Sequence, residues 1–270
     1  MNAPLLDVRD LHTHFRLPKA NPLASAQWVR AVNGVSFHIE AGEVLSLVGE
    51  SGCGKTTVGR TLTLLEKASS GSAVFEGTDI LSLSKSQFRP MRRDIQMIFQ
   101  DPFASLNPRL TIEKLLREPL TIHKLVSSRE QARDTIVNML ENVGLDSSAL
   151  SRYPHEFSGG QRQRIGIARV MVVKPKLIIA DEPVSALDVS IQAQVLNLLK
   201  QLQRDTGVAL LFISHDLAVV RHISDRLAVM FEGRIVETAN KRLLFDDPQH
   251  DYTKRLLSAI PRIPSFRQAG

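Results

Sequence analysis

The sequence predicts an α/β fold built around a parallel β-sheet, and three observations support this prediction. Short apolar segments alternate along the chain with segments of helical periodicity, as in sheets joined by helical crossovers. A glycine-rich segment at 49–57 lies between a strand pattern and a helix pattern. A stretch of helical pattern, roughly 101–153, interrupts the alternation, so we expect a helical lobe inserted into the sheet domain.

The N-terminal part of the chain predicts three strands and a helix. Residues 5–17 alternate in polarity as a half-buried strand does, and the Pro- and Ala-rich residues 18–28 are typical of a loop. Residues 29–50 predict two strands separated by a turn at Ala41–Gly42. Residues 55–66 predict a helix that begins at the glycine-rich segment.

The C-terminal half continues the alternation. The segment "KLIIAD" predicts a buried strand, and "VALLFISH" predicts another, followed by a short helix. The segment "RLAVMFEGRIVE" predicts a hairpin that turns at Glu232–Gly233. Between the segments "KLIIAD" and "VALLFISH", the sequence predicts a helix with five apolar residues on one face: Ile191, Val195, Leu198, Leu199 and Leu202.

Composition excludes several classes of protein. The apolar runs are strand-sized and fall far short of the ~20 residues that span a bilayer. The first ten residues lack a basic segment followed by an apolar one, so we expect no signal peptide. The net charge of +6 is typical of a solvated, mildly basic surface, and it also suits an anionic ligand, an anionic membrane surface or nucleic acid. Aromatic residues make up only 5% and do not interleave with the basic ones, so we expect no nucleic-acid partner.

The glycine-rich segment "GESGCGKTT" predicts a phosphate-binding loop. Gly49, Gly54, Lys55 and Thr56 satisfy the pattern G-x-x-x-x-G-K-[ST] in the strand-to-helix context that the pattern requires. Backbone N–H groups would surround the phosphates, Lys55 would reach the β- and γ-phosphates, and the Thr56 hydroxyl would bind Mg²⁺. We expect ATP to contact Gly49, Glu50, Ser51, Gly52, Cys53, Gly54, Lys55, Thr56 and Thr57.

Four polar residues follow the predicted apolar strands. Asp181 ends one strand and suits a magnesium site, and the adjacent Glu182 is the candidate general base. Gln100 and His215 follow two other strands, and ligands collect at the carboxyl edge of a parallel sheet. Gln100 can offer its amide oxygen to Mg²⁺ or water, and His215 can hydrogen-bond to the γ-phosphate.

A second glycine-rich helix start lies at Ser158. The pattern of a capping box is present from Ser158 to Gln161, and Gly159 and Gly160 leave the first N–H groups uncovered. A helix start of this kind either is a plain capped helix or binds an anion. Because the first loop already holds one nucleotide, we expect this helix to contact the nucleotide of a partner chain in a head-to-tail dimer.

The motifs together resemble the ATP-binding-cassette ATPases over about residues 5–261. The segments "GESGCGKTT", "IFQDP", "FSGGQRQR", "LIIADEPVSALD" and "ISHD" resemble the family's Walker A motif, Q-loop, signature, Walker B motif with D-loop, and switch histidine. The resemblance implies one domain over 1–270 with a P-loop NTPase (RecA-like) core, an N-terminal antiparallel β subdomain, a helical signature subdomain inserted at about 101–165, and a C-terminal tail helix in 240–270. It also implies that the D-loop residue Asp188 contacts nucleotide.

Longer segments narrow the resemblance to one kind of importer subunit. The segments "IQMIFQDPFASLNPRLTI" and "HDYTKRLLSAIP" resemble the second ATPase of oligopeptide, dipeptide and nickel importers. The resemblance implies a second ATPase subunit as partner (another chain or a second copy), two transmembrane permeases, an extracytoplasmic binding protein, and a peripheral position on the cytoplasmic face of the membrane. The cargo is a peptide, or alternatively nickel or another small solute. A soluble cassette ATPase of translation or DNA repair and a hydrolysis-dead regulatory module are the competing functions.

Four further expectations rest on single segments. The resemblance places an adenine-stacking aromatic at Phe15, with Trp28 as the alternative. Many peptide-importer ATPases of this family continue past the "SAIP" tail with a cysteine-rich segment, whereas this sequence stops at Gly270 and its only cysteine is Cys53, so we expect neither an iron–sulfur cluster nor a substrate-linked C-terminal domain. The helix start beside Cys53 predicts a lowered thiol pKa and inactivation by alkylation that ATP prevents. Residues Asp101 to Asn107 are the expected contact for a permease helix.

Overall fold

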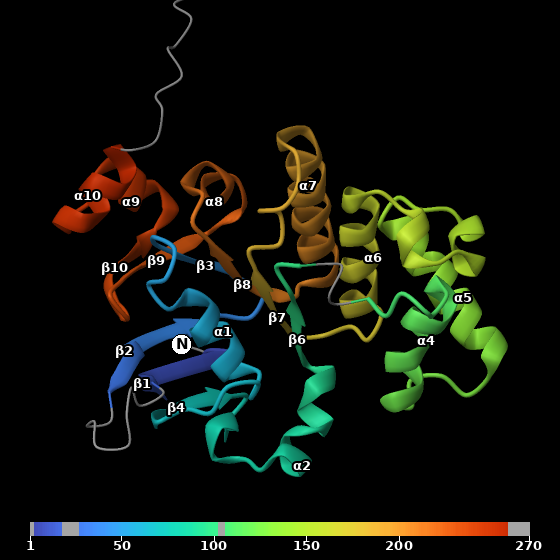
Figure 1. Ribbon diagram of the computed structural model, residues 1–270, viewed down its shortest axis with the longest axis horizontal. Helices are drawn as coiled ribbons and strands as arrows, with labels where there is room; N and C mark the ends of the chain where they lie inside the picture. The colour runs from blue at the N-terminus through green and yellow to red at the C-terminus, as the bar shows by residue number, and fades with distance from the viewer. Residues whose placement is uncertain (1–2, 18–26, 102–105, 259–270) are drawn as a thin grey trace, which may run out of the picture.

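The computed structural model describes residues 3–17, 27–101 and 106–258, and these residues form two β-sheets with helices around them (Figure 1). The four-stranded sheet has the order β2-β1-β4-β5, and the six-stranded sheet has the order β10-β9-β3-β8-β7-β6. The strands are β1 (Leu6–Arg16), β2 (Trp28–Ile39), β3 (Val44–Val48), β4 (Ser70–Phe75), β5 (Thr78–Asp79), β6 (Ile95–Ile98), β7 (Leu177–Asp181), β8 (Ala209–Ser214), β9 (Arg226–Phe231) and β10 (Arg234–Asn240).

The helices connect these strands and cover both faces of the larger sheet (Figure 1). The α-helices are α1 (Lys55–Leu62), α2 (Lys85–Phe88), α4 (Ile112–Ile122), α5 (Arg129–Asn142), α6 (Gly159–Met171), α7 (Val189–Thr206), α8 (Leu217–Ile223), α9 (Lys241–Asp246) and α10 (Asp251–Ser258). The 3₁₀ helices are η1 (Ile80–Ser82), η2 (Pro90–Arg93), η3 (Ser147–Ser151) and η4 (Pro154–Glu156). No described helix is both long and apolar enough to cross a membrane.

The larger sheet confirms the predicted parallel α/β core. Strands β9, β3, β8, β7 and β6 pair in parallel, and only β10 pairs antiparallel, through the predicted hairpin with β9. Strand β8 is buried along its whole length because both faces of the sheet are covered by apolar core. Leu210 and Phe212 enter the apolar core on one face of the sheet, and Leu211 and Ile213 enter the core on the other face.

The smaller sheet confirms the expected N-terminal antiparallel unit. Strand β1 pairs antiparallel with β2 and with β4. Helix α1 contacts β1 and β2 of this sheet as well as β7 and β8 of the larger one. The core around Val58 and Leu62, which are both fully buried, therefore joins the two sheets and fixes the start of α1 between them.

The helical lobe expected in the middle of the chain is present at one end of the larger sheet, beside β6 (Figure 1). Helices α4 and α5 contact each other, and both contact α6. Helix α6 also contacts β6 and α7, so the helix that begins at Ser158 connects the lobe to the sheet.

Two elements differ from their predicted extents. The helix predicted over 55–66 ends at Leu62, because Thr63 is its C-cap and Leu64 adopts a left-handed conformation with φ 53°. The predicted tail helix is two short helices, α9 and α10, of which α9 begins with Asn240 as its N-cap. Residues 259–270 of the predicted tail lie outside the described residues.

Candidate active site

The phosphate loop runs between β3 and α1, and close backbone packing makes two of its glycines necessary. Gly54 has φ 107°, and a Cβ atom there would lie 2.0 Å from the carbonyl oxygen of Ala31. A Cβ atom on Gly49 would lie 2.2 Å from the carbonyl oxygen of Met230. Gly54 is also the N-cap of α1 and supplies no side-chain cap, so the first N–H groups of the helix are open to an anion.

Lys55 is 4% exposed, and its side chain lies along its own loop. Its Nζ atom donates to the carbonyl oxygens of Gly49 at 2.7 Å and Glu50 at 2.8 Å, and it lies 3.7 Å from Sγ of Cys53. These partners leave the buried ammonium group without a carboxylate partner among the described residues. An anionic ligand in front of the loop would supply the missing negative charge.

Thr56 and Asp181 join the phosphate loop to the end of β7. The Thr56 hydroxyl donates to Oδ1 of Asp181 at 2.9 Å. Asp181 is 4% exposed, and burial raises the pKa of its carboxyl group, against the opposing effect of the Thr56 hydrogen bond. A hydroxyl and a buried carboxylate are the hard oxygen ligands that Mg²⁺ prefers, so this pair fits the metal that the sequence predicted.

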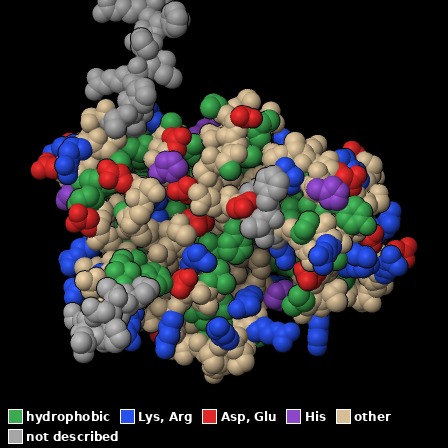
Figure 2. Space-filling view, viewed as in Figure 1, with side chains coloured by type: hydrophobic (Ala, Val, Ile, Leu, Met, Phe, Trp, Pro, Cys, Tyr) green, Lys and Arg blue, Asp and Glu red, His purple; other side chains and the backbone are tan. Residues whose placement is uncertain are grey.

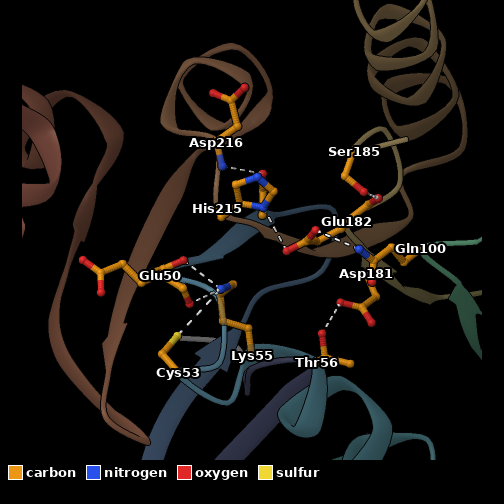
Figure 3. Close-up of polar contacts among 12 residues, drawn as sticks. Glu50, Cys53, Lys55, Thr56, Gln100, Asp181, Glu182, Ser185, His215 and Asp216 are labelled. Carbon is orange, nitrogen blue, oxygen red and sulfur yellow. Dashed lines mark hydrogen bonds and ion pairs between the residues drawn. The ribbon is translucent and has the colours of Figure 1, made fainter. Parts of the chain in front are cut away.

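Glu182 lies between two side chains from separate strand ends (Figure 3). Its Oε1 atom is 3.0 Å from Nδ1 of His215, and its Oε2 atom accepts a hydrogen bond from Nε2 of Gln100 at 3.2 Å. Its backbone N–H donates to the Ile213 carbonyl oxygen at 3.0 Å. Glu182 also has φ 44°, a conformation that is unfavourable for a side chain of this size. The carboxylate is thus fixed in direction by both its backbone and its two neighbours.

A cavity of about 560 Å³ brings most of the predicted residues together. The phosphate loop forms one part of the cavity wall. Glu182 forms another part, together with its hydrogen-bond partners Gln100 and His215. The described lining residues are Ala31, Ser51, Gly52, Gly54, Lys55, Thr56, Thr57, Gln100, Glu182 and His215. Gly49, Glu50 and Cys53 belong to the loop but do not line the cavity. Asp181 does not line it either, but it contacts Thr56, which does.

The second glycine-rich helix start does not reach this cavity. Ser158 caps α6 in the predicted capping box: its Oγ accepts from the Gln161 N–H at 3.3 Å, and its own N–H donates to Oε1 of Gln161 at 3.0 Å. Gly159 and Gly160 form the first turn of the helix. Asp188 is the exposed N-cap residue of α7 and makes no side-chain cap bond. None of the described residues that line the cavity comes from this group.

The two candidate adenine-stacking residues lie on the smaller sheet. Phe15 on β1 is 36% exposed and pairs with Val29, and Trp28 on β2 is 58% exposed and pairs with Arg16. Neither lines the cavity, although Ala31 on the same strand as Trp28 does.

The prediction for the Cys53 thiol was wrong in direction. The side chain is 8% exposed and packs in the core between the sheets. Burial raises the pKa of the thiol, and the positive charge of Lys55 opposes this without reversing it. The sequence pattern indicates the helix start but not that the sulfur atom beside it is buried in the core.

Two residues at the loop were absent from the sequence predictions. Ala31 lines the cavity, and Tyr252 of α10 contacts the loop backbone: its hydroxyl oxygen accepts a hydrogen bond from the Glu50 N–H at 3.1 Å. No periodicity or motif spacing indicates either contact, because both arise from tertiary packing of distant segments. Of the residues expected to contact a permease, 102–105 lie outside the described residues.

Comparison with known proteins shows which family this chain belongs to. The family model "ABC transporter" matches residues 32–185. The oligopeptide transport ATP-binding protein AppF of Bacillus subtilis is 52% identical, in an alignment that covers 95% of this chain and 78% of AppF. The di/tripeptide transport ATP-binding protein DppF of Pseudomonas aeruginosa is 52% identical, over 96% of this chain and 80% of DppF.

Solved structures agree with the sequence comparisons. The ATP-binding cassette MJ0796, in a dimeric post-hydrolysis state bound to ADP and Pi, superposes with a TM-score of 0.78 at 26% identity. That match covers 88% of this chain and 99% of the cassette. CbiO1 of Clostridium perfringens, part of an ABC transporter complex, has a TM-score of 0.77 at 26% identity, over 97% of this chain and 98% of CbiO1. The chain therefore belongs to the ABC transporter family, as one of its ATPases.

Proposed function

We propose that this chain hydrolyses ATP to drive the uptake of dipeptides and oligopeptides through partner permeases. AppF and DppF, each 52% identical to this chain, are peptide transport ATP-binding proteins, which supports a peptide cargo. The observation that carries the hydrolytic role is the fixed Glu182 carboxylate, which shares one cavity with Lys55. A nucleotide whose phosphates lie on the loop would present its γ-phosphate to this carboxylate.

The residues of the cavity have distinct roles in this proposal. Lys55 and the loop N–H groups bind the β- and γ-phosphates, and Glu182 takes a proton from the attacking water. Gln100 and His215 hold the Glu182 side chain in place, and both lie where they can also contact the γ-phosphate or the water. The strained backbone of Glu182 favours this assignment, because such conformations concentrate at functional sites.

Thr56, Asp181 and Gln100 are the proposed ligands of the magnesium site. When bound, Mg²⁺ would neutralise charge on the β- and γ-phosphates. The Thr56 hydroxyl already points at the Asp181 carboxylate, so both oxygens lie at one place beside the phosphate loop. Asp181 is buried there without a cationic partner within ion-pair distance among the described residues, which favours a cation as its eventual neighbour.

The signature helix would act on a second ATPase subunit. Ser158, Gly159, Gly160 and Gln161 form an open helix start, yet they do not line the cavity of their own chain. Each nucleotide would therefore lie between the phosphate loop of one subunit and the α6 start of the other, with Asp188 also in the interface. The dimeric state of the similar cassette MJ0796 supports this arrangement. The partner is a related ATPase or a second copy of this chain.

A second cavity offers a docking place for a permease. It has a volume of about 410 Å³ and lies where β6 and η2 face α4 and α6. Its apolar lining includes Leu65, Phe99 and Ile122, which are 48%, 41% and 53% exposed. Gln163 also lines it, with a buried Nε2 atom that has no hydrogen-bond partner among the described residues. A short cytoplasmic helix of a permease would cover the apolar residues and offer that atom a carbonyl oxygen.

Basic side chains around this second cavity also fit a permease as its partner. Arg89, Arg92 and Arg169 also line it, and Figure 2 shows Lys and Arg side chains along the lower edge of this face, between α2 and α4. The docked chain would be a peripheral subunit on the cytoplasmic face of the membrane. Two permeases and an extracytoplasmic binding protein would complete the importer.

Purification of the tagged full chain from detergent-solubilised host membranes tests the assembly. Two permeases and an ATPase subunit should co-purify and be identified by mass spectrometry. Ile122→Glu changes an exposed residue of the docking cavity, so it should lose the permeases and keep MgATP binding. The matched variant Leu243→Glu changes a similarly exposed residue on α9, outside this cavity, and should keep the permeases. Recovery of ribosomes or DNA-repair proteins without a membrane protein would contradict the proposal.

The cargo needs a separate experiment. The co-purified complex, reconstituted in vesicles with its binding protein, should accumulate a labelled dipeptide or oligopeptide when MgATP is supplied. Accumulation of Ni²⁺ but not of peptide would overturn the peptide assignment while leaving the importer assignment in place.

A further inference from the structure

Tyr252 of α10 packs directly against the phosphate loop, 202 residues away in the sequence. Its side chain is nearly inaccessible, with 3% exposed. Its hydroxyl oxygen accepts a hydrogen bond from the backbone N–H of Glu50 at 3.1 Å, and its ring lies 4.2 Å from the ring of Phe231, centroid to centroid. The aromatic contact fixes the ring on β9, and the hydroxyl group reaches from there to the loop.

The Glu50 N–H belongs to a peptide unit that Lys55 also contacts. The N–H of Glu50 and the carbonyl group of Gly49 share one planar amide, so neither can turn without the other. Lys55 Nζ donates to the Gly49 carbonyl oxygen at 2.7 Å, and Tyr252 accepts from the Glu50 N–H. One rigid plane therefore has the phosphate-binding lysine at one edge and the tyrosine hydroxyl at the other.

Helix α10 is itself anchored to the sheet beside it. The Glu237 carboxylate on β10 accepts hydrogen bonds from the backbone N–H groups of Gln249 at 2.8 Å and His250 at 3.0 Å. His250 in turn accepts the backbone N–H of Tyr252 on its Nδ1 atom at 3.1 Å. These contacts fix the start of α10, so the position of the Tyr252 hydroxyl is set by the larger sheet and not by the loop that it contacts.

We propose that Tyr252 is a positioning residue for ATP binding, which holds the Gly49–Glu50 peptide plane so that Lys55 lies ready for the phosphates. This inference rests on the proposed role of the loop as the ATP site. Tyr252 does not line the cavity proposed for the nucleotide; it acts through the Gly49–Glu50 peptide. Loss of the hydroxyl group frees the plane, and the loop must then be ordered by the nucleotide itself, which weakens binding.

The variant Tyr252→Phe removes the hydroxyl group and keeps the ring on Phe231. We expect the Kd for MgATP and the KM to rise about five-fold, the size of one lost hydrogen bond, while kcat changes less than about two-fold. Tyr153→Phe is the matched control, since Tyr153 is the only other tyrosine and is 40% exposed. It should leave the Kd unchanged. Glu237→Gln loosens the α10 anchor and should raise the Kd by a smaller factor.

Isothermal titration calorimetry on the full chain separates positioning from a folding defect, because it reports the Kd and the binding-competent fraction independently. A raised Kd at normal stoichiometry supports the proposal. An unchanged Kd for Tyr252→Phe, with either normal or reduced stoichiometry, overturns it. Failure of the wild-type chain to bind MgATP would overturn the proposed function instead, so the two failures are distinguishable.

Discussion

The Nδ1 atom of His215 lies 3.0 Å from Oε1 of Glu182, although the two residues come from the ends of different strands. Strands β7 and β8 are neighbours in the larger sheet and pair in parallel, so their carboxyl ends meet at one edge. Gln100, which follows β6 on the other side of β7, holds the second oxygen of the same carboxylate. The order of strands in the sheet therefore assembles the hydrolytic part of the cavity.

Asp181→Asn should make the nucleotide-free protein more stable and its ATPase weaker. Burial raises the pKa of Asp181 in the folded protein above its unfolded value, so the ionised carboxylate lowers stability at pH values above that folded pKa. The amide removes this cost and still accepts the Thr56 hydrogen bond. Thermal unfolding at pH 7 should show a raised Tm, and turnover should fall on the order of 100-fold because a magnesium ligand is lost.

The pH dependence of stability provides a check on that explanation. The gain in Tm for Asp181→Asn should be present at neutral pH and shrink as the pH falls through the raised pKa of the wild-type carboxyl group, where that group becomes neutral. A lowered Tm at pH 7 would contradict the proposed cost of the buried charge.

Gly54→Ala should abolish MgATP binding, whereas Gly52→Ala should weaken it only moderately. A Cβ atom on Gly54 would collide with the Ala31 carbonyl oxygen at 2.0 Å, so the loop or β2 must move. A Cβ atom on Gly52 meets no atom of the described chain within 4 Å, and the strain of φ 84° costs about 1 kcal/mol. Calorimetric Kd values for both variants measure the difference. Equal losses would show that conformational freedom, and not close packing, explains both glycines.

Ser158→Asp should separate helix capping from dimer formation. Aspartate caps a helix about as well as serine, so the Tm should stay within a few degrees of the wild-type value. The added negative charge would face the phosphates of the nucleotide on the partner subunit, so ATP-dependent association with the partner ATPase, whether a related chain or a second copy, should be lost. Size-exclusion chromatography with light scattering measures it, and Ser158→Thr is the control that retains the cap and the neutral charge. A dimer that survives Ser158→Asp argues for a purely structural role of the cap.

Cys53 should react slowly with a thiol reagent at neutral pH. Its buried sulfur and raised pKa leave little thiolate, in contrast to the reactivity that its place at a helix start suggests. Mass spectrometry of iodoacetamide labelling should show slower modification than for free cysteine, with the rate rising toward alkaline pH. Labelling at pH 7 faster than that of free cysteine would indicate that the thiol is exposed in solution.

The sequence predicts much of the fold because local patterns and tertiary structure agree here. Alternating apolar segments predict β7 and β8, and both are fully buried strands. The capping pattern at Ser158 predicts the start of α6 at the observed residue. Gln100, Glu182 and His215 can be grouped from the sequence, since each follows a strand of one parallel sheet.

The contacts that the sequence does not predict depend on packing between distant segments. The pattern around Cys53 indicates a helix start, but the direction of the sulfur atom depends on the core between the two sheets. Tyr252 contacts Glu50 only because β9, β10 and α10 return to the phosphate loop late in the chain. The left-handed backbone of Glu182 likewise has no local signal, since residues of this type seldom adopt it.

The most direct measurement of the hydrolytic proposal compares MgATP binding and phosphate release by the Glu182→Gln variant. The glutamine keeps the size of the side chain and loses its basicity, and Glu130→Gln on the exposed start of α5 is the matched control. We expect phosphate release to fall about 1,000-fold while the Kd for MgATP stays within about two-fold, with a stable ATP-bound dimer. Wild-type phosphate release by Glu182→Gln would contradict the assignment of Glu182 as the general base.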